Sequence, residues 1–433
     1  MKKYRVIISG AGGRDFSNYL VYFKKNPNYE VVAFTAAQIP GIEKRVFPKK
    51  LAKGKSIPIY SEENLTKLIK SLKIDYVFLS YSDLSDQYVM NFASKVLSAG
   101  ANFGLLGTKD TYVKSKKPVI AVTAVRTGSG KSQTSRAIAE ILRKKGKKVV
   151  AIRHSMPYGN LLKQTSQRFE KESDFKKYKT TIEEEEEYQP WIDHGFVVYS
   201  GFDYKEILSK AEKEADVIIF DGGNNDISFI KPDLLITVVD PHRAGHELTY
   251  YPGFVNFLMA DVIVVNKVDS AKKKDIETVK WNIFKHNPGA AVVLAKSELL
   301  INKSGSIKGK RCVVVGDGPT LTHGGMGYGA GSIAVRRHGG KFVNAKKYAV
   351  GSLKKTFKKY SHLNEVPAMG YSGKQIKELE KTVNRTPCDV VIDGTPANLK
   401  KLISVNKPMI EVDYELGEDS VRHLKNILSR KLK

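Results

Sequence analysis

The residues with the clearest chemical potential form a glycine-rich loop between a predicted strand and a predicted helix. The loop, residues 126–132 (RTGSGKS), follows the apolar run 119–125 and precedes a helical pattern that begins at Gln133. Backbone N–H groups in such a loop can surround nucleotide phosphates at a helix N-terminus, where the helix dipole favours anions. The nucleotide-binding residues predicted here are Thr127, Gly128, Ser129, Gly130, Lys131 and Ser132.

A P-loop of this kind assigns separate tasks to its side chains. We expect Lys131 to reach the β- and γ-phosphate oxygens and Ser132 to hold Mg²⁺. Asp221 ends the apolar run 216–221, which suits a Walker B strand, and we predict that it also binds Mg²⁺, directly or through water. One departure from the usual motif is that Val125 replaces its first glycine.

Arg126, at the second loop position, is the third predicted catalytic residue beside Lys131 and Asp221. An arginine there could neutralise phosphate charge in its own subunit, or across the interface of a homodimer. The alternative is a local ion pair with a carboxylate, and the sequence leaves both open.

A second nucleotide motif, NKVD, ends the apolar run 261–265. In GTPases the Asn and Asp of this motif contact the guanine base, so Asn266, Lys267 and Asp269 are predicted to contact the nucleotide base. The alternative is that Asp269 caps the following helix. The cofactor is therefore ATP or GTP, with Mg²⁺.

Three clusters rich in His, Arg and Gly follow other predicted strands. Because ligands bind at the carboxyl ends of strands in open α/β sheets, we interpret these clusters as substrate contacts. Arginine and protonated histidine would suit a small polyphosphorylated acid, and the third cluster could form a second anion cradle from its backbone N–H groups. The predicted substrate-binding residues are Arg153, His154, Tyr158, His242, Arg243, His246, Thr320, His323, Gly324 and Gly325.

An N-terminal loop, residues 9–15 (SGAGGRD), also follows a predicted strand. It differs from the dinucleotide motif GxGxxG, since Asp15 stands where the third glycine belongs, and no acid ends the second predicted strand. The loop favours a phosphate or a partner domain over a redox dinucleotide.

The scaffold that carries these motifs consists of short β-branched runs that alternate with charged helical segments along the whole chain. This alternation predicts an α/β fold with parallel sheets covered on both faces. We expect a Rossmann-like N-terminal domain over 1–115 and a P-loop NTPase domain over 116–302. A glycine-rich α/β region over 303–433 follows, either separate or continuous with the NTPase sheet.

Composition limits the remaining function classes. The formal net charge is +27 over 433 residues, mostly from lysines spread along the chain, so we expect a solvated basic surface and no nucleic-acid partner. Cys312 and Cys388 form no CxxC pair, and no run of 18 apolar residues occurs. We expect a cytoplasmic protein without a membrane span, and a solvated helix face or loop for the acidic run 183–187.

The motifs resemble those of the cyclic 2,3-diphosphoglycerate synthetase family, which consists of P-loop NTPases of the GTPase-like branch. The resemblance lies in RVIISGAGGRDF, VVAFTAAQIPGIE, RTGSGKSQTSR, RHSMPYGN, DVIIFDGGNND, VVDPHRAGHEL, NKVD and DGPTLTHGGMGYGAG, which extend over nearly the whole chain. It implies a ligase that uses ATP and Mg²⁺ to close 2,3-bisphosphoglycerate into its cyclic pyrophosphate, an archaeal solute, with release of ADP and phosphate.

Two other functions remain open from the sequence. NKVD suits a regulatory or metallochaperone-like GTPase, in which hydrolysis drives a conformational switch. A nucleic-acid-binding NTPase is the third function class, and only the basic charge suggests it.

Overall fold

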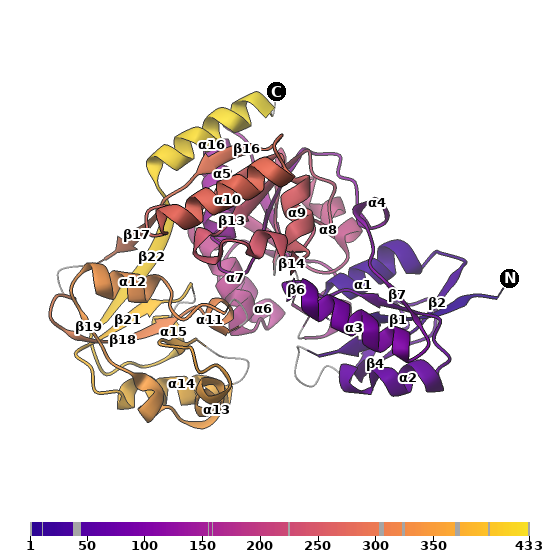
Figure 1. Ribbon diagram of the computed structural model, residues 1–433, viewed down its shortest axis with the longest axis horizontal. Helices are drawn as coiled ribbons and strands as arrows, with labels where there is room; N and C mark the ends of the chain where they lie inside the picture. The colour runs from indigo at the N-terminus through magenta and orange to yellow at the C-terminus, as the bar shows by residue number, and fades with distance from the viewer. Residues whose placement is uncertain are drawn as a thin grey trace.

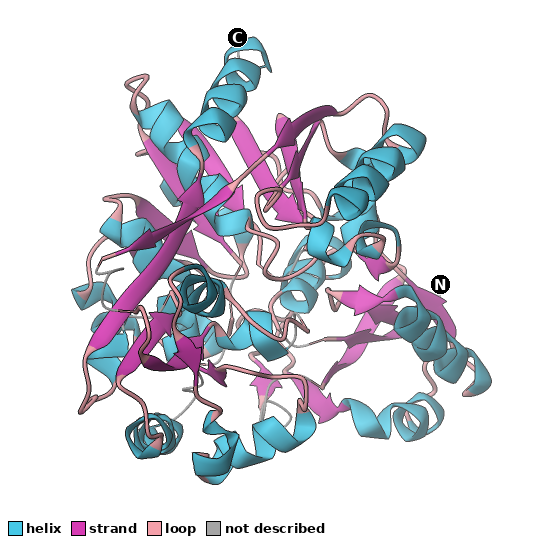
Figure 2. Ribbon diagram, turned by 60° about the vertical axis from the view of Figure 1, so that its left-hand side comes forward, coloured by secondary structure: helices cyan, strands magenta, loops and turns pink. Residues whose placement is uncertain are grey.

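A computed structural model describes residues 2–10, 12–37, 45–154, 156–157, 159–223, 226–302, 307–322, 325–368, 373–396 and 399–431. Three larger β-sheets follow one another along the chain, and helices pack on their faces (Figures 1 and 2). The expected α/β class with parallel sheets is confirmed. Within the described ranges, no helix has both the length and the apolar character needed to cross a bilayer.

The first sheet has the strand order β3-β4-β2-β1-β5-β7 and is parallel except where β3 pairs with β4. Its strands are β1 (Tyr4–Ser9), β2 (Tyr29–Ala36), β3 (Val46–Phe47), β4 (Ile57–Ser61), β5 (Tyr76–Leu79) and β7 (Asn102–Gly104). Its helices are α1 (Arg14–Asn18), α2 (Leu65–Ser71), α3 (Asp86–Ser98) and α4 (Thr108–Thr111), with a π-helical turn over Tyr19–Phe23.

The second sheet has the order β10-β11-β9-β12-β8-β13-β15-β16 and is parallel except at β10. Its strands are β8 (Val119–Ala124), β9 (Val149–Arg153), β10 (Gln167–Phe169), β11 (Val197–Ser200), β12 (Val217–Asp221), β13 (Leu234–Val239), β15 (Val262–Val265) and β16 (Ala291–Leu294). Its helices are α5 (Lys131–Arg143), α6 (Ser173–Tyr178), α7 (Ile182–Asp193), α8 (Tyr204–Ala211), α9 (Gly253–Met259) and α10 (Lys273–His286).

The central strand β8 shows why its apolar run folds as a covered strand. Ile120 and Val122 pack into the core beneath α5, whereas Val119 and Ala121 pack into the core on the opposite face. All four side chains are fully buried. Since successive strand residues point to opposite faces, a continuous apolar run requires helices on both sides. The P-loop is thereby held at the end of a rigid strand.

The third sheet has the order β17-β22-β21-β18-β19, and β20 also pairs with β18. Its strands are β17 (Ser297–Ile301), β18 (Arg311–Gly316), β19 (Lys341–Phe342), β20 (Val366–Pro367), β21 (Val390–Gly394) and β22 (Met409–Leu416). Its helices are α11 (Gly318–Thr322), α12 (Ala330–Arg337), α13 (Gly351–Lys359), α14 (Gly373–Arg385) and α15 (Leu399–Leu402).

The last helix, α16 (Glu418–Lys431), returns to the second sheet. Its Leu424 and Leu428 are buried in the core that also contains α5 and Val293 of β16. Figure 1 shows this yellow helix beside β16 and α5, away from the orange third sheet. The segment that forms the third sheet is thus inserted between β16 and α16 of the second region.

A small two-stranded sheet joins the first and second regions. It pairs β6 (Leu84–Ser85) with β14 (Tyr250–Tyr251) in antiparallel register. The boundaries predicted at 115/116 and 302/303 stay predictions, and β17 belongs to the third sheet although it precedes residue 303.

Candidate functional site

The P-loop has the backbone shape that its glycines allow. Gly128 and Gly130 adopt φ values of +78° and +102°, in the left-handed region. A Cβ atom on Gly130 would lie 1.9 Å from Nδ2 of Asn266. Glycine is therefore required at this position both by conformation and by the close approach of the NKVD segment.

Lys131, the first residue of α5, lies beside Asp221 at the end of β12. Its Nζ is 3.1 Å from Asp221 Oδ1, which also accepts a hydrogen bond from Ser135 Oγ at 2.9 Å. Arg153 and the Trp191 indole N–H donate to Oδ2. Burial opposes ionisation of Asp221, but Arg153 and Lys131 outweigh it and hold its pKa at about 2.

The environment of Lys131 has the opposite effect on its amine. Burial and the nearby Arg153 lower the pKa of Lys131 to about 8, although Asp221 partly compensates. The side chain is thus a desolvated cation close to its titration range, held where a nucleotide phosphate would bind.

Ser132 and Asp221 differ in their fitness as ligands of Mg²⁺. Asp221 is fully buried, and its two oxygens already receive the donors described above. Ser132, at the start of α5, carries a hydroxyl suited to the ion. Among the described residues, no three His, Cys, Asp or Glu side chains group as a metal site. Metal binding by Asp221 stays a prediction.

Asn266 and Lys267 of the NKVD motif contact the P-loop itself. Asn266 Nδ2 donates to the carbonyl of Ser129 at 2.9 Å, and Lys267 Nζ donates to that of Gly128 at 2.6 Å. Lys267 also pairs with Asp240 at 2.9 Å. These two side chains therefore brace the loop in the conformation seen.

Asp269 points away from the loop toward the third sheet. Its Oδ1 accepts from the Ser297 N–H at 3.0 Å, and its Oδ2 accepts from Arg337 at 2.8 Å. Helix α10 begins at Lys273 and its N-cap is Lys272, so Asp269 is not the cap residue of that helix. Its predicted contact with a nucleotide base stays a prediction.

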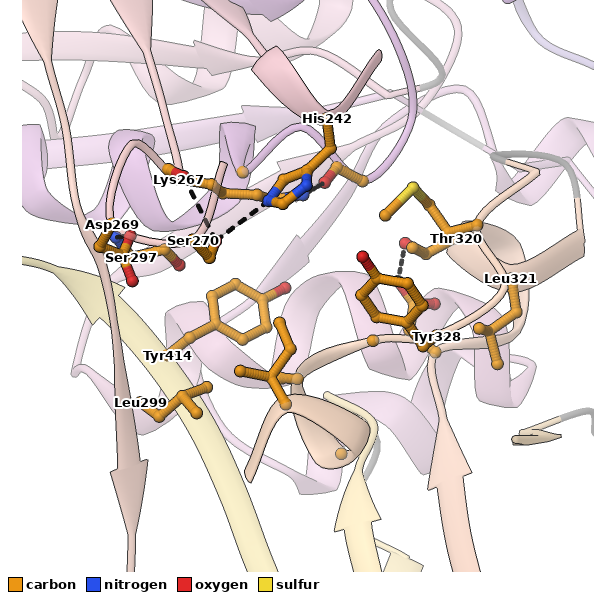
Figure 3. Close-up of a pocket in the computed structure, with 18 of the residues that line it drawn as sticks. His242, Lys267, Asp269, Ser270, Ser297, Leu299, Thr320, Leu321, Tyr328 and Tyr414 are labelled. Atoms are coloured by element: carbon orange, nitrogen blue, oxygen red, sulfur yellow. Dashed lines mark hydrogen bonds between the residues drawn. The ribbon is translucent and has the colours of Figure 1, made fainter. Parts of the chain in front are cut away.

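A cavity of about 80 Å³ lies between the P-loop and the third sheet (Figure 3). In the figure, Asp269 and Ser297 lie on one side of it, and Thr320 and Leu321 on the other. The P-loop contributes Gly128 and Gly130. Its larger apolar and aromatic lining residues are Leu299, Leu321, Met326, Tyr328, Ile333 and Tyr414. Such a mixed lining suits a flat organic group beside phosphates.

The cluster after β13 is organised by Asp240. Lys267 and Arg243 pair with its carboxylate and, despite burial, hold its pKa at about 2. Arg243 also donates to Ser129 Oγ at 3.3 Å, which brings it to the P-loop. His242 lies 3.0 Å from Ser270 Oγ, and burial lowers its pKa.

Arg126 makes a contact with the first region. Its Nε lies 2.6 Å from Asp83, its Nη1 donates to His246 Nδ1 at 2.6 Å, and its guanidinium covers the ring of Tyr250 at 3.7 Å. Asp83 also accepts from Thr127 Oγ1 at 2.7 Å. The local ion pair is thus the arrangement present, and a role for Arg126 in catalysis stays a prediction.

His246 does not carry the charge that we expected of a phosphate contact. Burial and the neighbouring Arg126 and Arg243 lower its pKa to about 4. The imidazole is neutral at physiological pH and accepts from Arg126, so it contributes hydrogen bonding without positive charge.

Arg153 and His154 turn in different directions after β9. Arg153 contacts Asp221 and Glu187, close to the P-loop. His154 lies 2.6 Å from Asp226, which also pairs with Arg14 of the first region at 3.0 Å. These contacts join the N-terminal loop to the second sheet. Tyr158 lies outside the described residues.

The glycine-rich segment after β18 covers the P-loop. A Cβ on Gly128 would lie 2.7 Å from Thr320 Cγ2. The N–H of Gly329, in the expected anion cradle, and that of the following Ser332 already donate to Glu365 at 2.7 and 3.2 Å. Gly325 adopts φ +67°, whereas His323 and Gly324 lie outside the described residues.

The acidic run 183–187 corrects a sequence prediction. It forms part of α7, and Glu183, Glu184 and Glu186 are buried where we expected a solvated face. The fully buried Tyr188 and Trp191 follow on the same helix. Tyr188 and Trp191 follow Glu184 at helical spacing, and this pattern in the sequence indicates that the face of α7 that carries Glu184 packs inward. Four further residues contact predicted site residues and were not identified from the sequence: Asp83, Trp191, Asp226 and Arg337.

Comparison with known proteins gives one extensive match. The arginine synthetase ArcE of Thermococcus kodakarensis is 56% identical to this chain over 432 residues, which are 99% of this chain and 96% of ArcE. A family described as the res subunit of type III restriction enzymes matches residues 54–222, less than half of the chain, including the P-loop and Asp221.

Two solved structures have weaker similarity. LpxK from Aquifex aeolicus, in its "apo" form in complex with ATP, is 14% identical with a TM-score of 0.43, over 85% of this chain and 100% of LpxK. A DUF1611 family protein from Anabaena variabilis is 11% identical with a TM-score of 0.23, over 67% of this chain and 95% of that protein. At these TM-scores neither similarity supports a functional assignment.

Proposed function

We propose that this chain, which belongs to the family of the arginine synthetase ArcE, forms arginine in a nucleotide-dependent reaction. The observation that carries the proposal is the 56% identity over 99% of the chain. The P-loop, in which Lys131 Nζ lies 3.1 Å from Asp221 Oδ1, provides a binding site for the nucleotide phosphates that this reaction needs.

The chemistry of arginine formation explains why a nucleotide is needed. A guanidinium group can be made from a neutral ureido group by exchange of its oxygen for nitrogen. Phosphoryl transfer from ATP to that oxygen forms an O–P bond, breaks the bond to ADP and creates a phosphate leaving group. Ammonia then forms the new C–N bond, the C–O bond breaks, and phosphate leaves with the oxygen. The products are a protonated guanidinium group, ADP and inorganic phosphate, so the protons balance.

The chain's own residues would perform the positioning in this reaction. Lys131 would neutralise charge on the transferred phosphoryl group, and Asp221 with Arg153 would hold Lys131 in place. Mg²⁺, held by Ser132, would shield the phosphates when bound. Arg243, at Ser129, would add charge beside the loop. The cavity next to Asp269 would take the nucleotide base.

A second candidate keeps the phosphoryl transfer and changes the acceptor. Closure of 2,3-bisphosphoglycerate into its cyclic pyrophosphate with ATP is favoured by the motif resemblance. It is also supported by the arginine and lysine that gather at Asp240 beside the P-loop. In this case one substrate phosphate attacks the γ-phosphoryl group and ADP leaves. The other substrate phosphate then attacks the phosphorus that carries the new phosphoanhydride, and inorganic phosphate leaves as the ring closes.

A product assay separates the candidates. The protein is incubated with Mg²⁺ and ATP or GTP, together with either the ureido analogue of arginine plus ammonium or 2,3-bisphosphoglycerate. Mass spectrometry then detects arginine or the cyclic product. We expect arginine, with one phosphate released per arginine. Nucleotide hydrolysis that ignores both acceptors would contradict the proposal and favour the switch GTPase.

A further inference from the structure

Four buried carboxylates interact pairwise near the carboxyl edge of the third sheet: Glu186 with Asp317 and with Asp393, and Glu365 with Asp317. We call these four residues the carboxylate cluster. The register explains their convergence. Gly316 of β18 pairs with Gly394 of β21, so Asp317 and Thr395 continue from neighbouring strands at the same level. Thr395 Oγ1 donates to Glu186 of α7 at 3.0 Å, which attaches the helix to this edge.

In the ranges that the structure describes, no cation offsets the burial of Glu186, Asp317 or Glu365, and Lys400 only partly offsets that of Asp393. Burial and the neighbouring Asp317 raise the pKa of Glu186 well above its usual range. Burial also raises the pKa of Asp317, and that of Asp393 to about 7. Among the described residues, Glu186, Asp317, Glu365 and Asp393 take part in no ion pair within 4.0 Å.

One oxygen of the cluster has no hydrogen-bond partner in the part of the chain that the structure describes. Glu365 is 1% exposed, and its Oε1 accepts from the N–H groups of Gly329 and Ser332, but its Oε2 has no donor among the described residues. A Cβ on Gly316 would lie 1.9 Å from Oε2, so this oxygen lies over the end of β18, next to Asp317. A buried, unpaired acceptor calls for a donor from outside the protein.

The cluster borders the nucleotide site. Asp317 lines the cavity that also contains Gly128 and Gly130 of the P-loop. Asp317 accepts from Thr320 Oγ1 at 2.5 Å, and Thr320 is the residue that covers Gly128. A group bound at the cluster would therefore lie beside the phosphates of a nucleotide.

We propose that the carboxylate cluster binds the guanidinium group of arginine next to the P-loop. The inference rests on the proposed function and assigns that function a substrate subsite. A guanidinium is planar, is permanently charged and presents five N–H donors, so it can pair with several carboxylates at once. Binding would supply the missing positive charge and a donor for Glu365 Oε2.

The test measures arginine affinity of the full-length protein by isothermal titration calorimetry. Glu186→Gln and Asp317→Asn keep shape but remove charge, and each should weaken arginine binding at least ~10-fold, as expected for loss of a buried charge-assisted hydrogen bond. The neutral ureido analogue should bind the variants as it binds the wild type. Glu378→Gln is the matched control, because Glu378 bonds to Ser352 on α13, outside the cluster.

Thermal unfolding without ligand guards against a folding artefact. Removing the charge of Glu186 or of Asp317, whose burial no cation offsets among the described residues, should leave the melting temperature unchanged or raise it. Unchanged arginine affinity in both variants, or equal losses for arginine and its ureido analogue, would overturn the inference. Binding of Mg²⁺ alone that depends on Glu186 and Asp317, without arginine binding, would also overturn it.

These outcomes are separable from those of the product assay. Arginine formation with cluster-independent arginine binding removes the inference and leaves the proposed function. Cluster-dependent arginine binding without arginine formation removes the proposed function and leaves a guanidinium site.

Discussion

The carboxyl edges of the second and third sheets invite comparison. Both follow parallel strands, both carry glycine-rich segments, and both bury carboxylates. At the second edge, Asp221 and Asp240 have pKa values held at about 2, because a lysine and an arginine contact each of them. At the third edge, burial raises the pKa of Asp393 to about 7, and Thr395 and Lys400 compensate only in part.

Burial opposes ionisation at both edges, and only at the second edge do contacting cations outweigh it. The second edge is balanced within the chain, so its cations are fixed before any ligand arrives. The third edge is short of positive charge, so its charge state depends on what binds. The following predictions test this contrast.

The largest expected effect comes from matched amide substitutions at the two edges. Asp221→Asn removes the carboxylate between the buried Arg153 and Lys131, leaves Arg153 with Glu187 alone, and should lower the free energy of unfolding by about 3–5 kcal/mol. Asp393→Asn should leave it unchanged or raise it. Urea unfolding at pH 7 measures both. Equal destabilisation by the two variants would break the comparison.

A smaller effect is expected on turnover from the cation of the second edge. Lys131→Met should reduce kcat by roughly 10²–10³-fold, since Lys131 meets the charge that develops on the transferred phosphoryl group. Lys144→Met, at the exposed C-terminal end of the same helix, serves as the control. A Lys131→Met enzyme that loses only affinity for nucleotide would restrict Lys131 to ground-state binding.

The smallest effect is a difference in pH dependence. The raised pKa of Asp393 adds stability that is complete below its unfolded value near 3.8 and is lost as the pH rises toward about 7. Between pH 4 and 7, wild-type protein should lose stability relative to Asp393→Asn by on the order of 1 kcal/mol per pH unit. Urea unfolding across this range measures the difference. A constant difference between the two proteins would mean that Asp393 keeps an ordinary pKa.

The lowered pKa of Asp221 works in the reverse sense. Its contribution is present above pH ~4 and should fade only as the pH falls toward about 2. The two edges are therefore expected to respond in different pH windows.

The sequence was sufficient for features encoded by local pattern. The apolar run before the P-loop predicted β8, and the run 216–221 predicted a strand that ends in an acid, as β12 ends in Asp221. Both depend on periodicity and on short motifs whose geometry repeats among proteins.

Contacts between distant segments could not be predicted in this way. Asp83 meets Arg126 only because β6 pairs with β14. The acidic run in α7 was expected to be solvated. The spacing of Tyr188 and Trp191 could have shown that this face packs inward, but the contact of Glu186 with Thr395, 209 residues away, could not be read from the sequence. The glycine-rich segment suggested an anion cradle, but the N–H groups of Gly329 and of the adjacent Ser332 donate to the carboxyl group of Glu365 in the same chain.

The return of α16 to the second sheet has a mechanical consequence. The chain enters the third sheet through β17 and leaves it through β22, and these two strands pair with each other from Ser297↔Leu416 to Ile301↔Val412. Both covalent connections between the second and third sheets therefore lie side by side, and side-chain contacts such as those of Thr395 with Glu186 and of Arg337 with Asp269 hold the third sheet against the second region.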